Sequence, residues 1–216
     1  DGSLNEGLDC RFYAQTQTDL YVVDPFEKTA DHVTSVPDLF DMDTHPNGTL
    51  YGITSSTLKR FDSSSSTWTD VGSLGSTGVP NGLAIDNQGT AYMTASNNLY
   101  TVDLTTGSAT LVGSMGGDFN SSGDCVINKD NTLFMSSDHS SNGDALVLID
   151  GDSGSASEVG TTGFDFIYGL TSAWGRMYGL TDNGELIEIN SSTGDATLIH
   201  TFPGKGWYGA ASTPGR

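Results

Sequence analysis

Three aspartates, Asp41, Asp43 and Asp124, have the residue type and spacing to bind a cation. Asp41 and Asp124 open two equivalent segments of the chain, DMDTH and DCVIN, and Asp43 lies two residues beyond Asp41. Alternate residues of a β-strand share a face, so these side chains would crowd together if the two segments converge. Crowded carboxylates repel each other and need a cation, a proton or water between them. Calcium accepts such oxygen ligands, so the sequence predicts either a calcium site or solvated carboxylates.

A second set of residues is suited to contact with a sugar. It lies in five irregular links, which read SVPDLFD, GSLGSTGVPNG, GSMGGDFNSSGD, GTTGFDFIYG and TFPGKGWYG. Aromatic rings offer flat apolar surfaces to C–H groups, while Asn and Asp side chains bond hydroxyl groups. The predicted ligand-binding residues are Phe40, Asn81, Phe119, Asp124, Phe166, Tyr168, Trp207 and Tyr208. The alternative is that some of these aromatic side chains only plug one end of a channel.

Residues arranged for catalysis are scarce. The four histidines fall at positions that are not equivalent, and no G-x-S-x-G segment provides a nucleophilic serine. The only acids that could act together are the three aspartates above, which leaves a calcium-dependent hydrolase or lyase as an alternative function. A longer segment, SSDHSSNGDA, carries Asp138, Asn142 and Asp144 and predicts either a calcium loop or a solvated hairpin.

The elements that must position these residues form a repeat. An aromatic residue recurs roughly every 40 residues, and each time a second apolar strand that ends in Asp or Asn follows it. The aromatic residues are Tyr13, Tyr51, Tyr92, Phe134 and Tyr178. The following strands read LYVVD, LKRFD, LYTVD, LVLID and LIEIN. A repeat of this length made only of short strands is typical of β-propeller blades.

The repeat predicts an all-β fold, with residues 1–216 forming a single five-bladed β-propeller of four-stranded blades. Four predicted blades span 39–72, 82–113, 124–160 and 169–200, and residues 1–10 form an N-terminal extension. The last segment, 209–216, supplies an inner strand with no partners after it, whereas residues 11–36 supply three strands with no inner strand before them. We therefore predict that the two termini pair to close the ring, which protects the last strand edges.

Most of the repeated residues have a structural interpretation. One aromatic side chain per blade at the same strand position is suited to packing adjacent sheets together. The Asp or Asn that ends each second strand directly precedes a turn, where such side chains bond their own backbone. Cys125 occupies a position that is apolar in the other repeats, and Cys10 lies a whole blade away from it. We therefore expect two unpaired thiols rather than a disulfide.

The phrases LYTVDLTTG and NGTLYG resemble those of the short-repeat propellers, namely the secreted NHL-type, YVTN-type and quinoprotein-like groups. The resemblance covers nearly the whole chain. It implies a propeller fold and secretion, and it implies no particular chemistry, because members of this superfamily differ widely in activity.

Charge narrows the range of partners. The formal net charge of −19 argues against nucleic-acid binding and against docking to anionic membranes, and no apolar run is long enough for a membrane helix. The acidic, Gly- and Ser-rich composition favours an extracytoplasmic protein. The leading hypothesis is a secreted or surface-displayed, monomeric, lectin-like module that recognises carbohydrate or an extracellular protein without catalysis. The third alternative is a structural domain of a larger adhesin or matrix protein.

Overall fold

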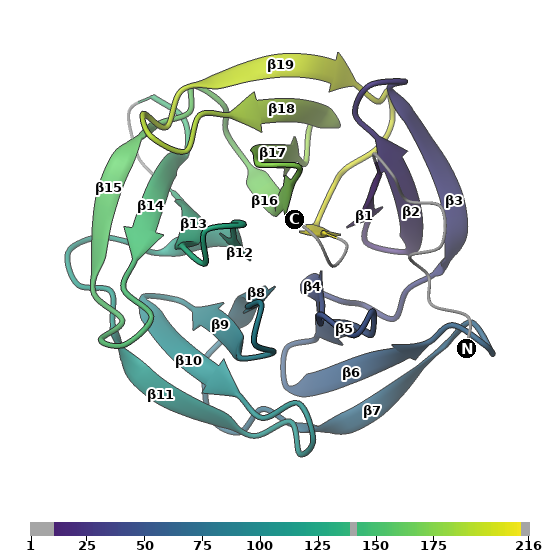
Figure 1. The fold of residues 1–216 in the computed structure, drawn as a ribbon, viewed down its shortest axis with the longest axis vertical. Helices are drawn as coiled ribbons and strands as arrows, with labels where there is room; N and C mark the ends of the chain where they lie inside the picture. Colours follow the sequence, from purple (N-terminus) through teal and green to yellow (C-terminus); the bar gives the residue numbers. More distant parts are fainter. Residues whose placement is uncertain (1–10, 139–141, 213–216) are drawn as a thin grey trace.

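The chain forms a ring of five β-sheets around a central axis (Figure 1). The computed structural model describes residues 11–138 and 142–212. Within these residues the regular elements are twenty β-strands, which form five antiparallel sheets of four strands each. The described part of the chain contains no helix with the length and apolarity needed to cross a membrane. The predicted all-β, five-bladed propeller is confirmed.

Each blade runs from an inner strand at the axis to an outer strand at the rim. Blade 1 consists of β4 (Asp41–Thr44), β5 (Leu50–Ile53), β6 (Thr57–Asp62) and β7 (Thr67–Ser73). Blade 2 consists of β8 (Pro80–Ile85), β9 (Ala91–Ala95), β10 (Asn98–Val102) and β11 (Ala109–Ser114). Blade 3 consists of β12 (Ser121–Ile127), β13 (Leu133–Ser137), β14 (Ala145–Ile149) and β15 (Ala156–Thr161). Blade 4 consists of β16 (Ile167–Ala173), β17 (Arg176–Thr181), β18 (Glu185–Ile189) and β19 (Ala196–Thr201).

The closing blade joins the two ends of the chain. Its inner strand is β20 (Gly209–Ala211), followed outward by β1 (Phe12–Gln15), β2 (Asp19–Asp24) and β3 (Thr29–Ser35). β20 pairs with β1 in antiparallel register, so that Tyr13 opposes Ala211 and Gln15 opposes Gly209. The predicted closure of the ring is therefore confirmed, and the strand edges at both ends are covered.

Burial falls from the axis outward. Every residue of the inner strand β4 is buried, whereas the outer strand β7 has no buried residue. The core lies between adjacent sheets, as where the ring of Phe12 in the closing blade stacks on Tyr178 of blade 4, with 5.3 Å between ring centres. Of the five repeated aromatic residues four are buried, and Tyr92 is half-buried. Cys125 is a buried free thiol in this core, and Cys10 lies outside the described residues.

The Asp or Asn at the end of each second strand shapes the turn that follows it. In all five blades its Oδ1 accepts the backbone N–H two residues further along, at 2.8–2.9 Å. The residues are Asp24, Asp62, Asp103, Asp150 and Asn190. Hydrogen bonds from the side chain and backbone of Thr105 lower the pKa of Asp103, and equivalent bonds lower the pKa of Asp62 and Asp150. The turn interpretation of these residues is confirmed.

Neighbouring blades also touch at a glycine near the end of the outer strand. A β-carbon on Gly160 would lie 2.0 Å from the backbone oxygen of Thr193 in the next blade, and equivalent collisions occur at Gly72 and Gly113. We expect Gly160→Ala to lower the free energy of unfolding by about 1–3 kcal/mol, because two backbone segments must move apart. Urea denaturation measures this change.

Thr34 provides the matched control, since it occupies the equivalent position of the closing blade and already carries a side chain. We expect Thr34→Ala to change the free energy of unfolding by about 0.5 kcal/mol or less. Equal effects of the two substitutions would show that the contact at Gly160 does not hold the blades together.

Candidate functional site

The channel aspartates link two pairs of neighbouring inner strands, β4 to β8 and β12 to β16. Asp41 Oδ2 accepts the N–H of Leu83 at 2.6 Å, and Asp43 Oδ2 accepts that of Ile85 at 2.7 Å. In the same way Asp124 Oδ2 accepts the N–H of Leu170. An inner strand has one edge that no neighbouring strand covers, and buried backbone N–H groups need an acceptor. The three carboxylates supply acceptors at that edge.

Asp41 and Asp124 form a buried pair. Both side chains are fully buried, and the described residues donate no hydrogen bond to the Oδ1 of either one. Burial raises the pKa of both carboxyls, and the nearby charge of Asp124 raises that of Asp41 further. Two carboxylate oxygens are both acceptors, so a proton held between them satisfies both. The protonated pair explains how two acids are tolerated at the axis.

This arrangement does not supply a calcium coordination shell. Calcium is coordinated by about six to eight oxygen atoms. In each channel aspartate one of the two carboxylate oxygens already accepts a hydrogen bond from a backbone N–H. Among the described residues no group of three His, Cys, Asp or Glu side chains is placed to hold a metal ion. The calcium site predicted at Asp41, Asp43 and Asp124 therefore stays a prediction, and we derive no chemistry from it.

A polar cavity lies between blades 3 and 4, on the side where the inner strands begin. We call this cavity of about 240 Å³ the mouth pocket. Its walls come from the start of β12 and the link before it, from both ends of the β13–β14 loop, and from the start of β16 and the link before it. The lining residues are Asn120, Ser121, Ser122, Asp138, Asp144, Asp165, Phe166 and Tyr168.

Asp144 is the fixed acid of the mouth pocket. Its side chain is only 4% exposed, and its Oδ2 accepts the hydroxyl of Ser122 and the N–H of Ile167, both at 2.8 Å. Both of the hydrogen bonds that described residues give this carboxylate end on Oδ2, so neither of them occupies Oδ1. Burial raises the pKa of Asp144 to about 6, and the charges of Asp138 and Asp165 add to that shift.

An aromatic row borders the same cavity. Phe166 is 50% exposed and meets Tyr168 edge to face at 6.2 Å between ring centres, and Tyr168 lies 6.0 Å from Tyr208. The backbone of Phe166 has φ of 60°, a conformation that bulky residues rarely adopt. Its carbonyl accepts the N–H of Asp182 at 3.0 Å, which helps to fix this conformation. The exposed ring is thus held beside the acids.

The predicted contact face is only partly assembled. Phe166 and Tyr168 line the mouth pocket, and Tyr208 adjoins it through Tyr168. Phe40, Asn81 and Phe119 are half-buried and are not among the pocket residues. The Asn81 side chain instead donates to the carbonyl of Ser121 at 2.9 Å, and Phe119 packs on the core between blades 2 and 3.

Two of the predicted contact residues lie in the interior. The placement of Trp207 on the exposed face is wrong, because this side chain is fully buried between blade 4 and the closing blade. Asp124 is also fully buried and belongs to the channel pair. A ligand in the mouth pocket contacts neither residue.

The prediction overlooked several lining residues, chiefly Asn120, Ser122 and Asp165. Asp138 and Asp144 were predicted to belong to a calcium loop or a solvated hairpin rather than to this pocket, because nothing in the sequence shows that their loop turns toward the link before β16. One feature of the sequence could have pointed to these residues. The β13–β14 loop and the link before β16 both differ from the equivalent segments of the other blades.

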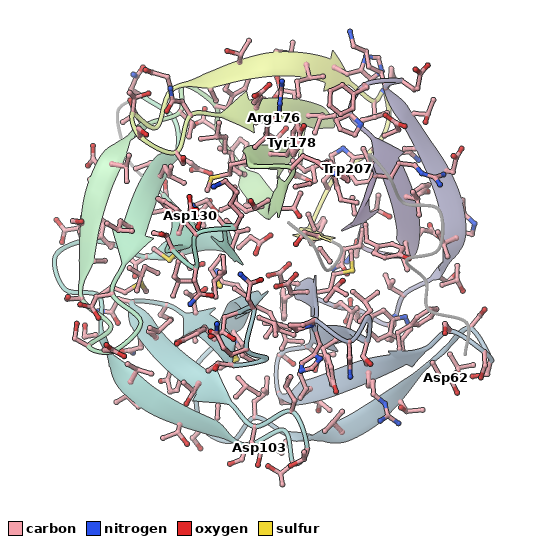
Figure 2. All side chains as sticks on the ribbon, viewed as in Figure 1. Asp62, Asp103, Asp130, Arg176, Tyr178 and Trp207 are labelled. Carbon is pink, nitrogen blue, oxygen red and sulfur yellow. The ribbon has the colours of Figure 1, made fainter. Side chains whose placement is uncertain are left out.

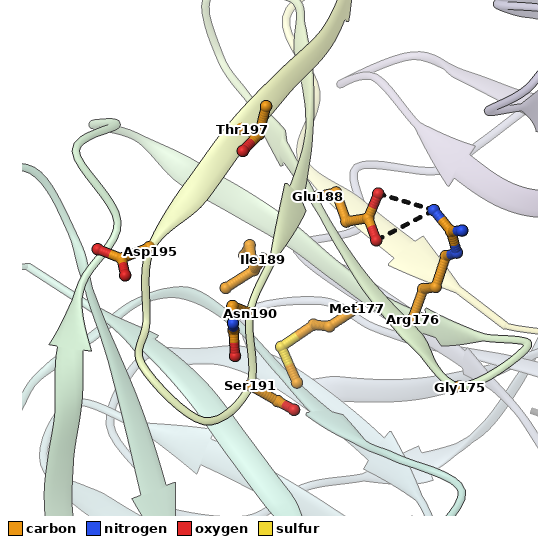
Figure 3. Close-up of a pocket in the computed structure, with 9 residues that line it drawn as sticks. All are labelled: Gly175, Arg176, Met177, Glu188, Ile189, Asn190, Ser191, Asp195 and Thr197. Carbon is orange, nitrogen blue, oxygen red and sulfur yellow. Dashed lines mark hydrogen bonds and ion pairs between the residues drawn. The ribbon is translucent and has the colours of Figure 1, made fainter.

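A larger groove on blade 4 has a structural explanation. It measures about 490 Å³ and is crossed by an ion pair from Arg176 Nη1 to both oxygens of Glu188, at 2.9 and 3.1 Å (Figure 3). Blade 3 has a groove lined by the equivalent residues of its own last hairpin, with Ile149 and Asp150 in place of Ile189 and Asn190. The groove therefore recurs with the blade, whereas the mouth pocket breaks the repeat.

Comparison with known proteins supports the fold. Virginiamycin B lyase from Staphylococcus aureus is 13% identical, with a TM-score of 0.50 over 91% of this chain and 72% of the lyase. An inactive variant of that lyase, solved with quinupristin, is 12% identical, with a TM-score of 0.51 over 94% and 74% of the two chains. Hydrazine synthase from Kuenenia stuttgartiensis is 17% identical, with a TM-score of 0.54 over 76% of this chain and 50% of the synthase.

The chain is a five-bladed β-propeller. No protein-family model and no curated protein matches this propeller. The identities to solved structures are low, so the likeness shows the fold alone, and the function must be argued from the mouth pocket.

Proposed function

We propose that this propeller is a secreted or surface-displayed carbohydrate-binding module that holds a sugar in the mouth pocket. One observation carries the proposal: a half-exposed aromatic ring, Phe166, stands beside a cavity lined by carboxylates, hydroxyls and an amide. Sugar rings present C–H groups on their faces and hydroxyls at their edges, and this combination of side chains complements both.

Under this proposal each lining side chain has a task. Phe166 offers its ring for stacking, while Asp138, Asp165 and Asn120 offer acceptors and donors at the rim. Asp144 presents a second, fixed acceptor, because Ser122 and the backbone of Ile167 hold it in place. Ligand pockets commonly measure about 300–1,000 Å³, so a cavity of about 240 Å³ suits one sugar unit rather than an enclosed chain.

Catalysis is the second candidate, and one observation favours it. Asp144, with its pKa raised to about 6, has the property of a general acid or base that works near neutral pH. Asp138 or Asp165 would then be the second acidic group at the cavity. Incubation of the protein with each bound oligosaccharide, followed by analysis of the reducing ends, distinguishes turnover from simple binding.

The proposal is tested with a glycan array followed by calorimetric titration of the best ligand. We expect Phe166→Ala to weaken binding about tenfold, since stacking on an aromatic ring contributes about 0.5–1.5 kcal/mol beyond the area it buries. The thermal midpoint should change little, because half of the ring is already in solvent.

Phe26 is the matched control, at 54% exposure and in the β2–β3 turn of the closing blade. Phe26→Ala should leave glycan affinity unchanged. Equal affinities of Phe166→Ala and the unaltered protein, or an array without any glycan bound, would contradict the proposal. The second result would favour an extracellular protein ligand or a structural role in a larger assembly.

A further inference from the structure

We infer that the sugar bound in the mouth pocket carries a positively charged amino group. This inference rests on the proposed function and specifies its ligand class. Three carboxylates, from Asp138, Asp144 and Asp165, line a cavity of about 240 Å³, and no Lys or Arg is among the described lining residues. Such a lining repels uronic acids and sugar phosphates and attracts cations.

The environment of Asp144 points to a missing positive partner. This residue is only 4% exposed, and the partners that hold its carboxylate, Ser122 and the backbone of Ile167, are both neutral. A buried charge is costly unless an opposite charge lies close to it. Neither partner occupies Oδ1 of Asp144, and this oxygen can receive an ammonium hydrogen bond, which is stronger than a bond from a neutral hydroxyl.

The aromatic border suits the same group. An ammonium near an aromatic ring face is attracted by the negative potential of the ring, by about 0.5–2 kcal/mol. Phe166 and Tyr168 meet edge to face beside the three acids, so a cation in the pocket is within reach of rings and carboxylates together.

The carboxylates are spread around the cavity rather than focused on one point. No three acidic, His or Cys side chains among the described residues are placed to hold a metal ion. A bare ion needs several oxygens at one short distance. An organic cation with a larger body fits a dispersed arrangement better, and the exposed ring of Phe166 can pack against that body.

The inference also predicts how ligand affinity depends on pH, because Asp144 can be protonated. The groups that face Asp144 are the acids Asp138 and Asp165, while Tyr168 faces it from blade 4. Protonation of Asp144 removes the charge that an ammonium needs. For a ligand whose amine stays protonated, affinity should therefore fall about tenfold between pH 7 and pH 5, with Asp144 titrating near pH 6.

A matched series of sugars tests the charge by NMR titration at pH 7. The probes are 6-amino-6-deoxyglucose and glucosamine, against glucose and glucuronic acid, which differ at single positions of one ring. We expect the better of the amino sugars to bind at least about tenfold more tightly than glucose, and glucuronic acid to bind most weakly. If glucose binds as tightly as both amino sugars, the inference is wrong. The proposed function is not contradicted by that result.

Two substitutions localise the effect. Asp144→Asn keeps an acceptor for Ser122 and Ile167 and should abolish both the preference for amino sugars and the loss of affinity at pH 5. Asp165 is exposed, so Asp165→Asn preserves folding and should weaken amino-sugar binding several-fold without changing glucose binding. Unchanged preference in both variants overturns the inference.

Two further outcomes would show that the pocket binds a different ligand or no sugar at all. If Nα-acetyl-lysine amide binds more tightly than the amino sugars, the pocket is assigned to a basic protein partner. That result overturns the amino-sugar inference. The absence of binding by every sugar of the series, together with a silent glycan array, removes the proposed function itself.

Discussion

Replacement of Trp207 by alanine is expected to lower the free energy of unfolding by about 3–5 kcal/mol. The indole is fully buried and packs edge-on against Phe202 of blade 4 and Tyr21 of the closing blade, with ring centres 5.5 and 5.6 Å away. It is among the largest fully buried side chains of the described residues. Its loss leaves a cavity at the joint that closes the ring, and urea denaturation measures the cost.

Trp174 offers a control of the same residue type. It is 41% exposed in the turn between β16 and β17, so Trp174→Ala should change the free energy of unfolding by about 0.5 kcal/mol or less. A Trp207→Ala variant as stable as Trp174→Ala would mean that the joint between blade 4 and the closing blade is loosely packed. That result would contradict the buried position of the indole.

The difference between these two tryptophans shows where sequence reasoning succeeds. The blades were predictable because each repeats the same alternation of apolar and polar residues, so that Tyr13 and Tyr178 could be placed in the core by comparison with their counterparts. Trp207 lies in a link that has no repeated counterpart. Its inward direction depends on the path of that link, where the N–H of Trp207 bonds the carbonyl of Thr181 at 3.3 Å.

The candidate site was predictable to the same limited extent. Phe166 and Tyr168 were found because they sit in a link that breaks the repeat. Asp144 was not recognised as their neighbour, because the convergence of two loops from adjacent blades depends on the ring itself. In a chain with 27 acidic residues, no local pattern separates an acid that faces a pocket from one that faces solvent.

The channel pair was predictable in position but not in chemistry. Strand equivalence brings Asp41 and Asp124 to the axis, which favours a cation or water between them. The sequence does not show the direction of the unpaired backbone N–H groups that these carboxylates accept, such as that of Leu83. Those bonds fix both carboxylates in the buried interior, where a shared proton costs less than two charges.

The titration of the channel pair leads to the second large effect: Asp41→Asn should become progressively more stable than the unaltered protein as pH rises above 4. The folded-state pKa values of Asp41 and Asp124 are raised, whereas an unfolded chain releases these protons near pH 3.9. Between that pH and the folded-state pKa the native state holds more protons, so rising pH favours unfolding. The cost reaches about 1.4 kcal/mol per pH unit for each proton retained.

Asparagine reproduces the protonated state of Asp41. Its oxygen can accept the N–H of Leu83 as Asp41 does, and its amide can donate toward Asp124 without a proton that alkali removes. The difference in unfolding free energy between Asp41→Asn and the unaltered protein, measured from pH 4 to pH 8, should therefore grow with pH. A difference that stays constant would contradict a shared proton.

Asp103 gives a control of opposite sign. This residue lies at the rim of the ring (Figure 2), and hydrogen bonds from Thr105 lower its folded-state pKa. Its contribution to stability is fully present above the unfolded pKa and is lost as pH falls below about 4, so the stability difference between Asp103→Asn and the unaltered protein should stay constant from pH 4 to pH 8 and shrink only at lower pH. A chelator separates the proton from calcium: if calcium bridged an ionised Asp41 and Asp124, EDTA would destabilise the unaltered protein at pH 8. A shared proton predicts no change on addition of EDTA, whereas destabilisation by EDTA would support the calcium site.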